Sequence, residues 1–424
     1  MENNISLTSG TGTSIIVDRC QVCNNPELES VLFLGYIPPV NQMRPVGIRP
    51  GEQPSYPAEL LFCQRCKLVQ IGCIVDPGVL FPPDYPYTSG TTQILHDNFE
   101  EMVHDCNTNV ERMKESDLII DIGSNDGTLL SKWKNAGYNV YGIEPSDKAQ
   151  LANDHAIPTM QAFFNRSTAL EVRDKVGLAK VITATNVFAH IENIHDIVES
   201  ILLLIREDGI FISESHYLMG LIETVQYDTI YHEHLRYYSL HSLKYLLDMH
   251  GLEIIYAKKI PTHGGSIRVY ASRKGKFPVQ DCIKDILEDE ISRGVETSEA
   301  LKIFARNVVL TKLKLYALLK NIKEDGGHVY GVGAPSRAST LISYTGLDNG
   351  ILDCVLEIKY SHKIGKYMPG TIIPVMEESK LFIDQPAYAL LLSWHIAEEL
   401  MPKIRKKGFK GKFILPLPEP RIVE

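Results

Sequence analysis

The stretch DLIIDIGSNDGTLL, from Asp117 to Leu130, decides the fold class of this chain. An apolar run of strand character ends in Asp121, and a loop with Gly123 and Gly127 then leads into an apolar helix start. Glycines at these positions let the backbone pass close to a ligand where a side chain would obstruct it. A strand, a glycine loop and a helix in this order predict the first unit of an open α/β sheet.

Strand-like runs alternate with helical stretches after this loop. They read NVYGIEP, KVITATNVFAHI and GIFISES, and such alternation is typical of a parallel sheet built from βαβ units. Two further runs, LEIIYAKKI and GGSIRVYASR, have no helical stretch between them and predict an antiparallel sheet edge. A second alternating series, HVYGVGAPS, ILDCVLEI, YALLLSWH and GKFILPLP, follows a charged helical region at residues 279–324 and predicts another open α/β domain.

The charges around the first loop indicate the ligand class. Glu144 ends the next strand about twenty residues on, where a carboxylate can accept both hydroxyls of an adenosine ribose. A dinucleotide fingerprint would read GxGxxG, whereas this loop carries Asp126, which would repel a pyrophosphate. Asp121 and Asp126 therefore favour a cationic sulfonium ligand, S-adenosylmethionine, over NAD. The alternative is a generic strand-to-helix turn with a solvated acid after it.

Two later segments are expected to reach the same crevice. Asn186 and His190 come just past a strand, at the end where open α/β sheets bind ligands. Phe163, in QAFFN, is expected to wall the adenine ring, although two adjacent aromatic residues also suit a core. The residues predicted to bind the cofactor are Asp121, Gly123, Asn125, Asp126, Gly127, Glu144, Phe163 and Asn186.

The segment YDTIYHEHLRYYSL, residues 227–240, follows the strand run GIFISES and has three interpretations. The HxH pair could bind a metal, but the sequence fixes no third ligand. Proton abstraction suits the residues better, because histidine titrates near neutrality and a carboxylate such as Glu233 can orient His234 or raise its basicity. A tyrosine hydroxyl such as that of Tyr231 can stabilise a developing oxyanion. The third interpretation is a polar surface loop.

Four cysteines form two CxxC pairs, Cys20 with Cys23 and Cys63 with Cys66. This spacing lets both sulfurs of each pair reach one ion, and two pairs make a tetrahedral zinc site. Four thiolates leave no open position for chemistry, so a structural role is favoured over free thiols or a redox pair.

Composition limits the classes of function. A chain of 424 residues with 44% hydrophobic and 22% charged residues is expected to form two or three soluble domains. A net charge of −9 argues against broad nucleic-acid binding. The sequence shows neither an apolar run of about 18 residues nor a secretory signal, so we expect a cytoplasmic protein without a membrane partner.

Taken in order, the motifs resemble those of nucleotide-sugar C-methyltransferases, which modify deoxysugars at the carbon beside a keto group. They are the double CxxC module, DIGSNDG, NVFAHI, YHEH followed by YYS, HGGSIRVY, GVGAP and GKYMPGTIIPV, and they cover nearly all of the chain. The resemblance implies three domains: a zinc-binding domain at residues 1–80, a class I methyltransferase (Rossmann-like) domain at 81–278, and a C-terminal Rossmann-like domain at 279–424. The last begins with a helical region and is expected to bind the sugar nucleotide.

The resemblance also implies a reaction. A base removes the proton next to the ketone of a 4-keto sugar, and the enolate attacks the methyl group of S-adenosylmethionine. The catalytic residues that it implies are His234 as the base, with Tyr231, Glu233 and His190 beside it, and Tyr85 in FPPDYPYTSG as a lining of the sugar pocket. Tyr87 is close enough in sequence to Tyr85 to share that last assignment.

The C-terminal third departs from the family pattern. After GAP the family commonly has lysine, glycine and asparagine, whereas this chain has Arg337, Ala338 and Ser339. Glu357 replaces the usual aspartate and His395 replaces an expected asparagine. Arg337 keeps a positive charge for phosphate without the shape of lysine. These changes bear on the sugar and the nucleotide and leave the methyl-transfer residues untouched.

The basic candidates for the substrate diphosphate are Arg337, Lys363 and Lys366. Gly331 and Gly333 suit either a nucleotide or a packing role. The expected function is methyl transfer to a carbon of a nucleotide-linked 4-keto-deoxysugar by a monomer. The rivals are an O- or N-methyltransferase, an oxidoreductase, which the missing GxGxxG disfavours, and a non-catalytic zinc-containing binding protein.

Overall fold

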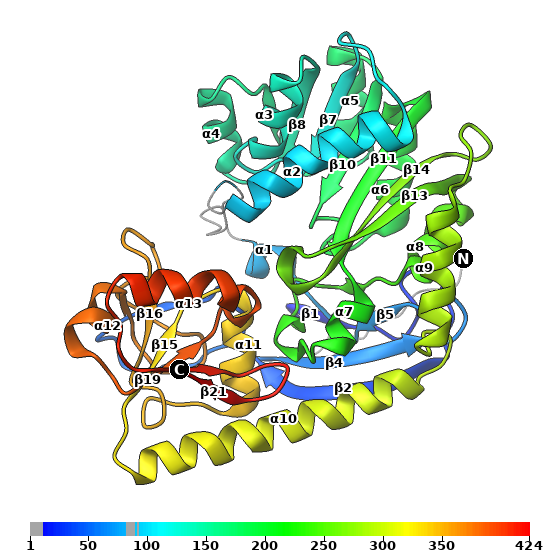
Figure 1. The fold of residues 1–424 in the computed structure, drawn as a ribbon. Coiled ribbons are helices and arrows are strands. Elements are labelled where there is room, and N and C mark those ends of the chain that lie inside the picture. The colour runs from blue at the N-terminus through cyan, green and yellow to red at the C-terminus, as the bar shows by residue number, and fades with distance from the viewer. Residues whose placement is uncertain (1–11, 82–89, 91–92) are drawn as a thin grey trace.

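The computed structural model describes residues 12–81, 90 and 93–424. Three large sheets organise the chain, one each in its N-terminal, central and C-terminal parts (Figure 1). The central sheet lies above the N-terminal sheet in this view, and the C-terminal sheet lies beside them.

The central sheet has seven strands in the order β13-β14-β11-β10-β7-β8-β9. The strands from β11 to β9 run parallel, and β14 and β13 extend the β11 edge in antiparallel pairs. The strands are β7 (Leu118–Ile122), β8 (Asn139–Glu144), β9 (Thr159–Gln161), β10 (Ala179–Thr185), β11 (Ile205–His216), β13 (Leu252–Ile260) and β14 (Ser266–Arg273). Strand order reverses between β7 and β10, which is where open α/β sheets bind ligands.

Helices cover both faces of this sheet because its parallel strands are apolar on both sides. The helices of this part are α2 (Gln93–Asp105), α3 (Thr128–Asn135), α4 (Lys148–Asp154), α5 (Arg166–Val176), α6 (Ile194–Leu204), α7 (Leu218–Glu223) and α8 (Leu240–Met249), with η2 (Cys106–Val110), η3 (Tyr227–Thr229) and η4 (Thr262–Gly264). Apolar residues of α2 and α3 share a core with Ile119 and Val181. Those of α5 and α6 share another with Ile120 and Ile182, on the opposite face.

The N-terminal sheet has the order β12-β5-β4-β2. Its strands are β2 (Leu28–Ile37), β4 (Tyr56–Cys63), β5 (Val69–Ile71) and β12 (Arg236–Tyr237), and a smaller sheet joins β1 (Ser14–Ile16) to β6 (Cys73–Val75), which α1 (Pro77–Leu80) follows. Strand β12 comes from the central part of the sequence and pairs antiparallel with β5. The segment of Tyr231, Glu233 and His234 is thereby fastened to the N-terminal sheet.

The C-terminal sheet has the order β18-β16-β15-β19-β20-β21 and is parallel except for β21. Its elements are β15 (Val329–Val332), α11 (Ser336–Thr345), β16 (Cys354–Glu357), β18 (Val375–Glu377), α12 (Ser379–Asp384), β19 (Tyr388–Leu391), η5 (Trp394–Ile396), α13 (Ala397–Lys406), β20 (Lys412–Leu415) and β21 (Arg421–Val423). Two helices, α9 (Asp281–Ser292) and α10 (Glu299–Glu324), lead into it, and α10 runs along β2 (Figure 1). A second reversal of strand order lies between β15 and β19.

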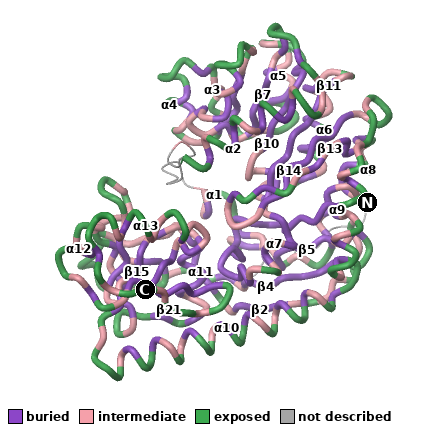
Figure 2. Tube along the Cα trace, in the orientation of Figure 1, coloured by how far each residue is buried: buried purple, intermediate pink, exposed green. Residues whose placement is uncertain are grey.

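The predicted fold class is confirmed: an N-terminal cysteine module precedes two α/β parts with parallel sheets. The expected boundaries at 80/81 and 278/279 stay predictions, and two strand pairs run across them, β12 with β5 and β3 (Arg44–Pro45) with β17 (Lys366–Tyr367). One core cluster joins residues of all three sheets, and buried backbone continues between them in Figure 2. No helix in the described part of the chain has the length and apolar character needed to span a membrane.

Candidate active site

The glycine loop after β7 is shaped by contact with the segment after β10. Gly123 has φ 71°, and a Cβ there would lie 2.4 Å from Cγ2 of Val187. Gly127 has φ 78° and stands directly before α3. A side chain at Gly123 would therefore meet both backbone strain and a steric clash, which explains the glycine that the sequence places there.

Two of the predicted cofactor carboxylates lie at the ends of β7 and β8. Asp121 is buried and accepts a 2.6 Å hydrogen bond from Oγ1 of Thr183. Burial raises the pKa of Asp121 to about 7, and the nearby Glu144 adds to the rise. Glu144 accepts from the backbone N–H of Asn125 at 2.9 Å, and its other oxygen accepts from the N–H and the hydroxyl of Ser146 at 2.9 and 2.6 Å. Together they make this edge of the sheet attractive to a cation.

The remaining predicted cofactor residues surround the same edge. Asp126 accepts from the backbone N–H of Gly90 at 3.0 Å and from the hydroxyl of Thr128 at 2.7 Å. The ring of Phe163, just beyond β9, is 62% exposed and is free to cover a bound ring, in contrast to a core position. Asn186 has φ 55°, and its buried Oδ1 has no hydrogen-bond partner among the described residues.

A cluster of histidines lies past the ends of β10 and β11. The ring centroid of His234 lies 4.9 Å from that of His190 and 5.0 Å from that of His216. His216 in turn stacks on His263 at 5.5 Å, and the Nε2 of His263 lies 3.4 Å from Nδ2 of Asn186. The cluster therefore continues directly into the predicted cofactor edge.

The hydrogen bond of His234 fixes its tautomer. Nδ1 of His234 lies 2.8 Å from the carbonyl oxygen of Thr229, and since a carbonyl only accepts, this nitrogen carries the proton. Nε2 of the neutral ring is then a free base. Burial lowers the pKa of His234 well below its usual value, and the neighbouring His190 adds to this effect. The tilted ring of Tyr231 lies against it, with centroids 4.2 Å apart.

The other histidines of the cluster are also neutral at neutral pH. Burial lowers the pKa of His190 to about 4 and that of His263 to about 4, and it lowers the pKa of His216 well below the usual value. A proton accepted by His234 would thus enter a site without any charged imidazole beside it.

The two histidines of the HxH pair point in different directions. Nε2 of His232 donates to the carbonyl of Pro57 in β4 at 3.1 Å, whereas His234 faces the cluster. This divergence removes the basis for a metal site at the pair. All of residues 225–240 are buried, which also rules out the polar surface loop. Glu233, between the two histidines, accepts from Nδ2 of Asn41 at 2.8 Å.

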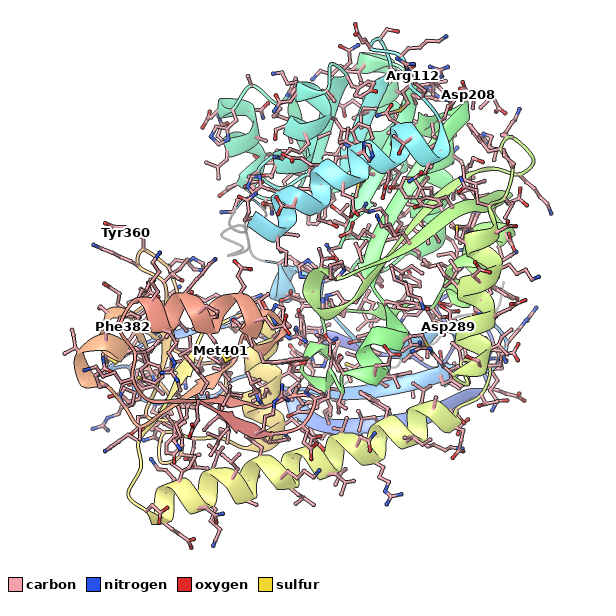
Figure 3. The ribbon with its side chains drawn as sticks, viewed as in Figure 1. Arg112, Asp208, Asp289, Tyr360, Phe382 and Met401 are labelled. Carbon is pink, nitrogen blue, oxygen red and sulfur yellow. The ribbon has the colours of Figure 1, made fainter. Side chains whose placement is uncertain are left out.

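Two of the basic residues predicted to bind the substrate diphosphate, Arg337 and Lys363, lie near this segment and have different bonding partners. The guanidinium of Arg337, at the start of α11, binds Asp228 and Gln226 and stacks on Trp394 at 5.0 Å. Lys363 is half-buried and donates to the carbonyl of Ala334 at 2.6 Å, and desolvation of its ammonium group lowers its pKa. It lies in the loop that carries the outward-facing Tyr360 of Figure 3.

Strand pairing positions the backbone of Lys366, and close packing explains the two glycines that the sequence singled out here. Lys366 begins β17, opposite Pro45. A Cβ on Gly333, which has φ 83°, would lie 2.3 Å from the hydroxyl oxygen of Ser393, and one on Gly331 would lie 2.9 Å from Leu392. Both glycines are thus required by close packing between β15 and the end of β19. The predicted Tyr85 and Tyr87 lie outside the described residues.

The four paired cysteines converge. The Sγ atoms of Cys20 and Cys66 are 3.4 Å apart, as are those of Cys23 and Cys63, and all four lie within 4.8 Å of one another. A tetrahedron with metal–sulfur bonds of about 2.3 Å has edges of about 3.8 Å, so the donor set suits one ion. Within residues 12–81, 90 and 93–424 it is the one such group of His, Cys, Asp and Glu ligands.

Sequence reasoning missed three residues of this site. His216 is the residue after the run GIFISES, so it could have been found as the first position beyond a strand end. His263 opens the motif HGGSIRVY and has φ 55°, and the two glycines after it also have positive φ, so this motif marks an irregular turn before β14. Asn41 belongs to the N-terminal part, and no local pattern connects it to residue 233.

Comparison with known proteins agrees with this architecture. Three family profiles match successive parts of the chain: a zinc binding domain at residues 20–81, a methyltransferase domain at 94–257 and a C-methyltransferase C-terminal domain at 261–418. The C-methyltransferase NovU of Streptomyces niveus is 31% identical over an alignment 419 residues long, and the match covers 96% of this chain and 97% of that protein.

Solved structures match part of the chain at low similarity. The magnesium protoporphyrin IX methyltransferase ChlM of Synechocystis PCC 6803 has a TM-score of 0.32 and 16% identity, covering 42% of this chain and 79% of its own. The PH0226 protein of Pyrococcus horikoshii OT3 has a TM-score of 0.33 and 12% identity, and the match covers 44% of this chain and 95% of that protein. With the full-length match to NovU, the predicted recognition is confirmed: this chain belongs to the C-methyltransferase family.

Proposed function

We propose that the protein transfers a methyl group from S-adenosylmethionine to the carbon beside the ketone of a nucleotide-linked 4-keto-deoxysugar. The observation that carries the proposal is His234, a buried neutral imidazole whose Nδ1–H is held by Thr229 and whose Nε2 is a free base. It lies past the carboxyl ends of β10 and β11, in a segment that sheet β12-β5-β4-β2 holds in place.

His234 takes the proton from the carbon next to the ketone in this proposal. Negative charge then develops on the ketone oxygen, which needs a hydrogen-bond donor. Tyr231 suits that role because burial raises the pKa of its hydroxyl well above the usual value and so keeps the proton in place. Glu233 and His190 are proposed to complete the polar surroundings of the base, and Tyr85, which lies outside the described residues, is proposed to line the sugar pocket.

S-adenosylmethionine, when bound, supplies a methyl group that its sulfonium makes electrophilic. Asp121, Asp126 and Glu144 surround the glycine loop with negative charge, and the raised pKa of Asp121 is the mark of a carboxyl that lacks a compensating cation. The residues proposed to hold the cofactor are Asp121, Gly123, Asn125, Asp126, Gly127, Glu144, Phe163 and Asn186. Holding the methyl in line with the sugar carbon makes the reaction effectively unimolecular.

We propose Zn²⁺ as the ion of the four cysteines, in a structural role, because four thiolates leave it no open position. Lys363 and Lys366 are proposed to bind the diphosphate. Arg337 stays a weaker candidate for this role, since its guanidinium already binds Asp228. Tyr87 is proposed to line the sugar pocket with Tyr85.

Deuterium exchange tests this proposal. The enzyme is incubated in deuterium oxide with a panel of 4-keto nucleotide sugars and S-adenosylhomocysteine, and the mass of the sugar is followed. We expect the wild type to introduce deuterium and His234→Asn to introduce none. His232→Asn is the matched control, because that neighbouring ring bonds to Pro57 and faces away from the cluster.

The outcome separates the rival functions. Methyl transfer to a sugar without exchange at carbon would indicate an O- or N-methyltransferase. Neither exchange nor transfer, with zinc and cofactor bound, would indicate a binding protein. Full exchange by His234→Asn would overturn the assignment of the base.

A further inference from the structure

Asn41 joins three segments that are far apart in the sequence. It follows β2 of the N-terminal sheet, and its Nδ2 donates to Oε1 of Glu233 at 2.8 Å. Its Oδ1 accepts from the hydroxyl of Ser336, the first residue of α11, at 3.3 Å. A carboxylate only accepts hydrogen bonds, so the amide nitrogen must face Glu233 and the amide oxygen must face Ser336.

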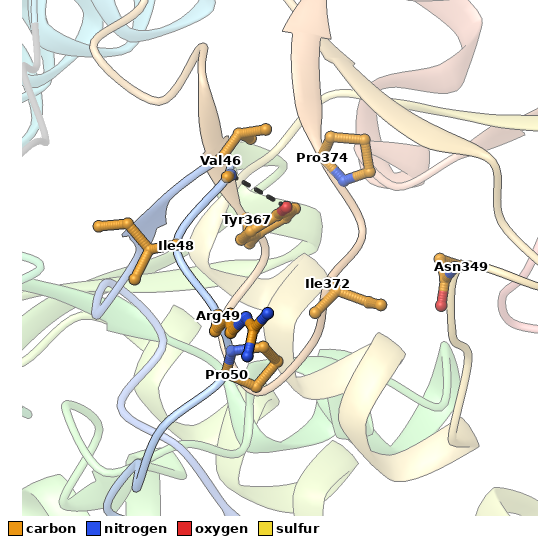
Figure 4. Close-up of a pocket in the computed structure, with 9 residues that line it drawn as sticks. Val46, Ile48, Arg49, Pro50, Asn349, Tyr367, Ile372 and Pro374 are labelled. Atoms are coloured by element: carbon orange, nitrogen blue, oxygen red, sulfur yellow. Dashed lines mark hydrogen bonds between the residues drawn. The ribbon is translucent and has the colours of Figure 1, made fainter.

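The backbone on both sides of Asn41 is fixed to the C-terminal part. The carbonyl of Val40 accepts from the hydroxyl of Ser339 in α11 at 3.0 Å. Beyond Asn41, β3 pairs with β17, and the N–H of Gly47 donates to the hydroxyl of Tyr367 at 3.1 Å (Figure 4). Anchors before and after Asn41 hold its side chain at a defined place, so its bond to Glu233 does not depend on a mobile loop.

The carboxylate of Glu233 needs such an anchor. Its side chain is buried, between the diverging rings of His232 and His234, and a buried carboxylate is costly unless donors meet its oxygens. An amide is a neutral donor, so it satisfies the oxygen without cancelling the negative charge. The negative charge of Glu233 adds to the rise in the pKa of Tyr231 and opposes the fall that burial causes in the pKa of Lys363.

We infer that Asn41 is a positioning residue for the Glu233 carboxylate, and that the cysteine module therefore contributes to the active site. This inference rests on the proposed function, because it concerns the orientation of a residue beside the base. In this role Asn41 acts through its hydrogen bond to Glu233.

The test compares Asn41→Asp with Asn41→Ala, Ser336→Ala and the control Gln42→Ala, whose side chain is the next one along the chain. Asn41→Asp keeps the size and the oxygen toward Ser336 but places a second carboxylate against Glu233. Two such carboxylates share a proton and raise one pKa strongly. We expect kcat to fall by about 100-fold at high pH and to recover in part as pH is lowered, with the affinity for S-adenosylhomocysteine and the metal content unchanged.

Asn41→Ala is expected to lower kcat without that pH-dependent recovery, whereas Ser336→Ala and Gln42→Ala are expected to stay close to wild type. An Asn41→Asp enzyme with the wild-type kcat and pH profile would overturn the inference. So would a loss of activity that Gln42→Ala reproduces, since that loss reports only on the fold of the segment.

A structural measurement keeps the inference separate from the proposed function. If the wild type introduces deuterium into none of the 4-keto nucleotide sugars, the proposed function fails. The kinetic comparison of the Asn41 variants on those sugars then carries no information. Crystal structures of wild type and Asn41→Ala still decide the inference. The Glu233 carboxylate is expected to leave its place in the variant, and an unmoved, equally ordered carboxylate would contradict the positioning role.

Discussion

Arg337 and Asp228 form a buried bidentate ion pair between the C-terminal part and the segment that carries His234. Nε and Nη2 of Arg337 each lie 2.9 Å from an oxygen of Asp228, and Nε1 of Trp394 donates to the same carboxylate at 2.7 Å. Gln226 accepts from Nη2 at 2.8 Å. The contact thus fixes residues 226–228 against α11 and η5.

Arg337→Ala is expected to destabilise the protein by about 3–5 kcal/mol, because it leaves the carboxylate of Asp228 buried without its partner. Thermal and denaturant unfolding of the substrate-free protein measure the effect. Asp228→Asn combined with Arg337→Ala should recover part of the loss, since no uncompensated charge remains. A variant of wild-type stability with weakened nucleotide-sugar binding would instead support the diphosphate role of Arg337.

Asp121 is expected to make the ligand-free protein less stable as pH rises. Burial raises its pKa from 3.8 to about 7, so between these values the folded chain holds a proton that the unfolded chain releases. The stabilisation is full below the lower value and is lost as pH rises through the upper one. Melting temperatures at about pH 5 and about pH 8 should therefore differ less in Asp121→Asn than in wild type. An identical pH dependence in both proteins would contradict this reading.

The rate of the proposed reaction should have no acidic limb near the usual pKa of histidine. Because burial lowers the pKa of His234 well below 6.5, its Nε2 remains a free base at that pH. With saturating cofactor and substrate, kcat is expected to stay level as pH falls from about 8 to about 6. A fall centred near 6.5 would show that the acting base has an unshifted pKa.

Cys20→Ser together with Cys63→Ser is expected to abolish metal binding and to unfold the N-terminal sheet, because metal-binding energy of such modules is folding energy. Elemental analysis and a thermal melt with and without chelator measure both effects. Cys282→Ser is the matched control, since this thiol lies outside the cluster. Retained zinc and normal solubility in the double variant would show that the ion is held elsewhere.

Local patterns in the sequence were enough to predict the central sheet, its glycine loop and the cysteine pairs. The run from Asp117 to Leu130 is sufficient to predict its own structure, because strand, turn and helix follow one another directly in the sequence. The same holds for the CxxC pairs. The spacing within each pair is visible in the sequence, whereas the fold brings the two pairs together.

The partners across the domains could not be predicted. Asn41 meets Glu233, and Asp228 meets Arg337, only because three sheets pack into one core, and no spacing in the chain encodes those meetings. Arg337 shows the limit well. A cation beside a glycine-rich strand end suggests phosphate, but a carboxylate more than a hundred residues earlier in the chain already binds it.

The pairing of β12 with β5 has a consequence for how the protein is made. Synthesis proceeds from the N-terminus, so β5 leaves the ribosome with an open edge that stays unmatched until residues 236–237 emerge. By then the residues of the parallel strands β7 to β11 have been synthesised, because they precede β12, the strand that completes the N-terminal sheet. Strand β5 is only three residues long, so its unpaired edge offers few backbone groups for pairing with other polypeptide chains. A chain cut after residue 80 lacks β12, so the N-terminal sheet is complete only after the segment that carries His234 has been made.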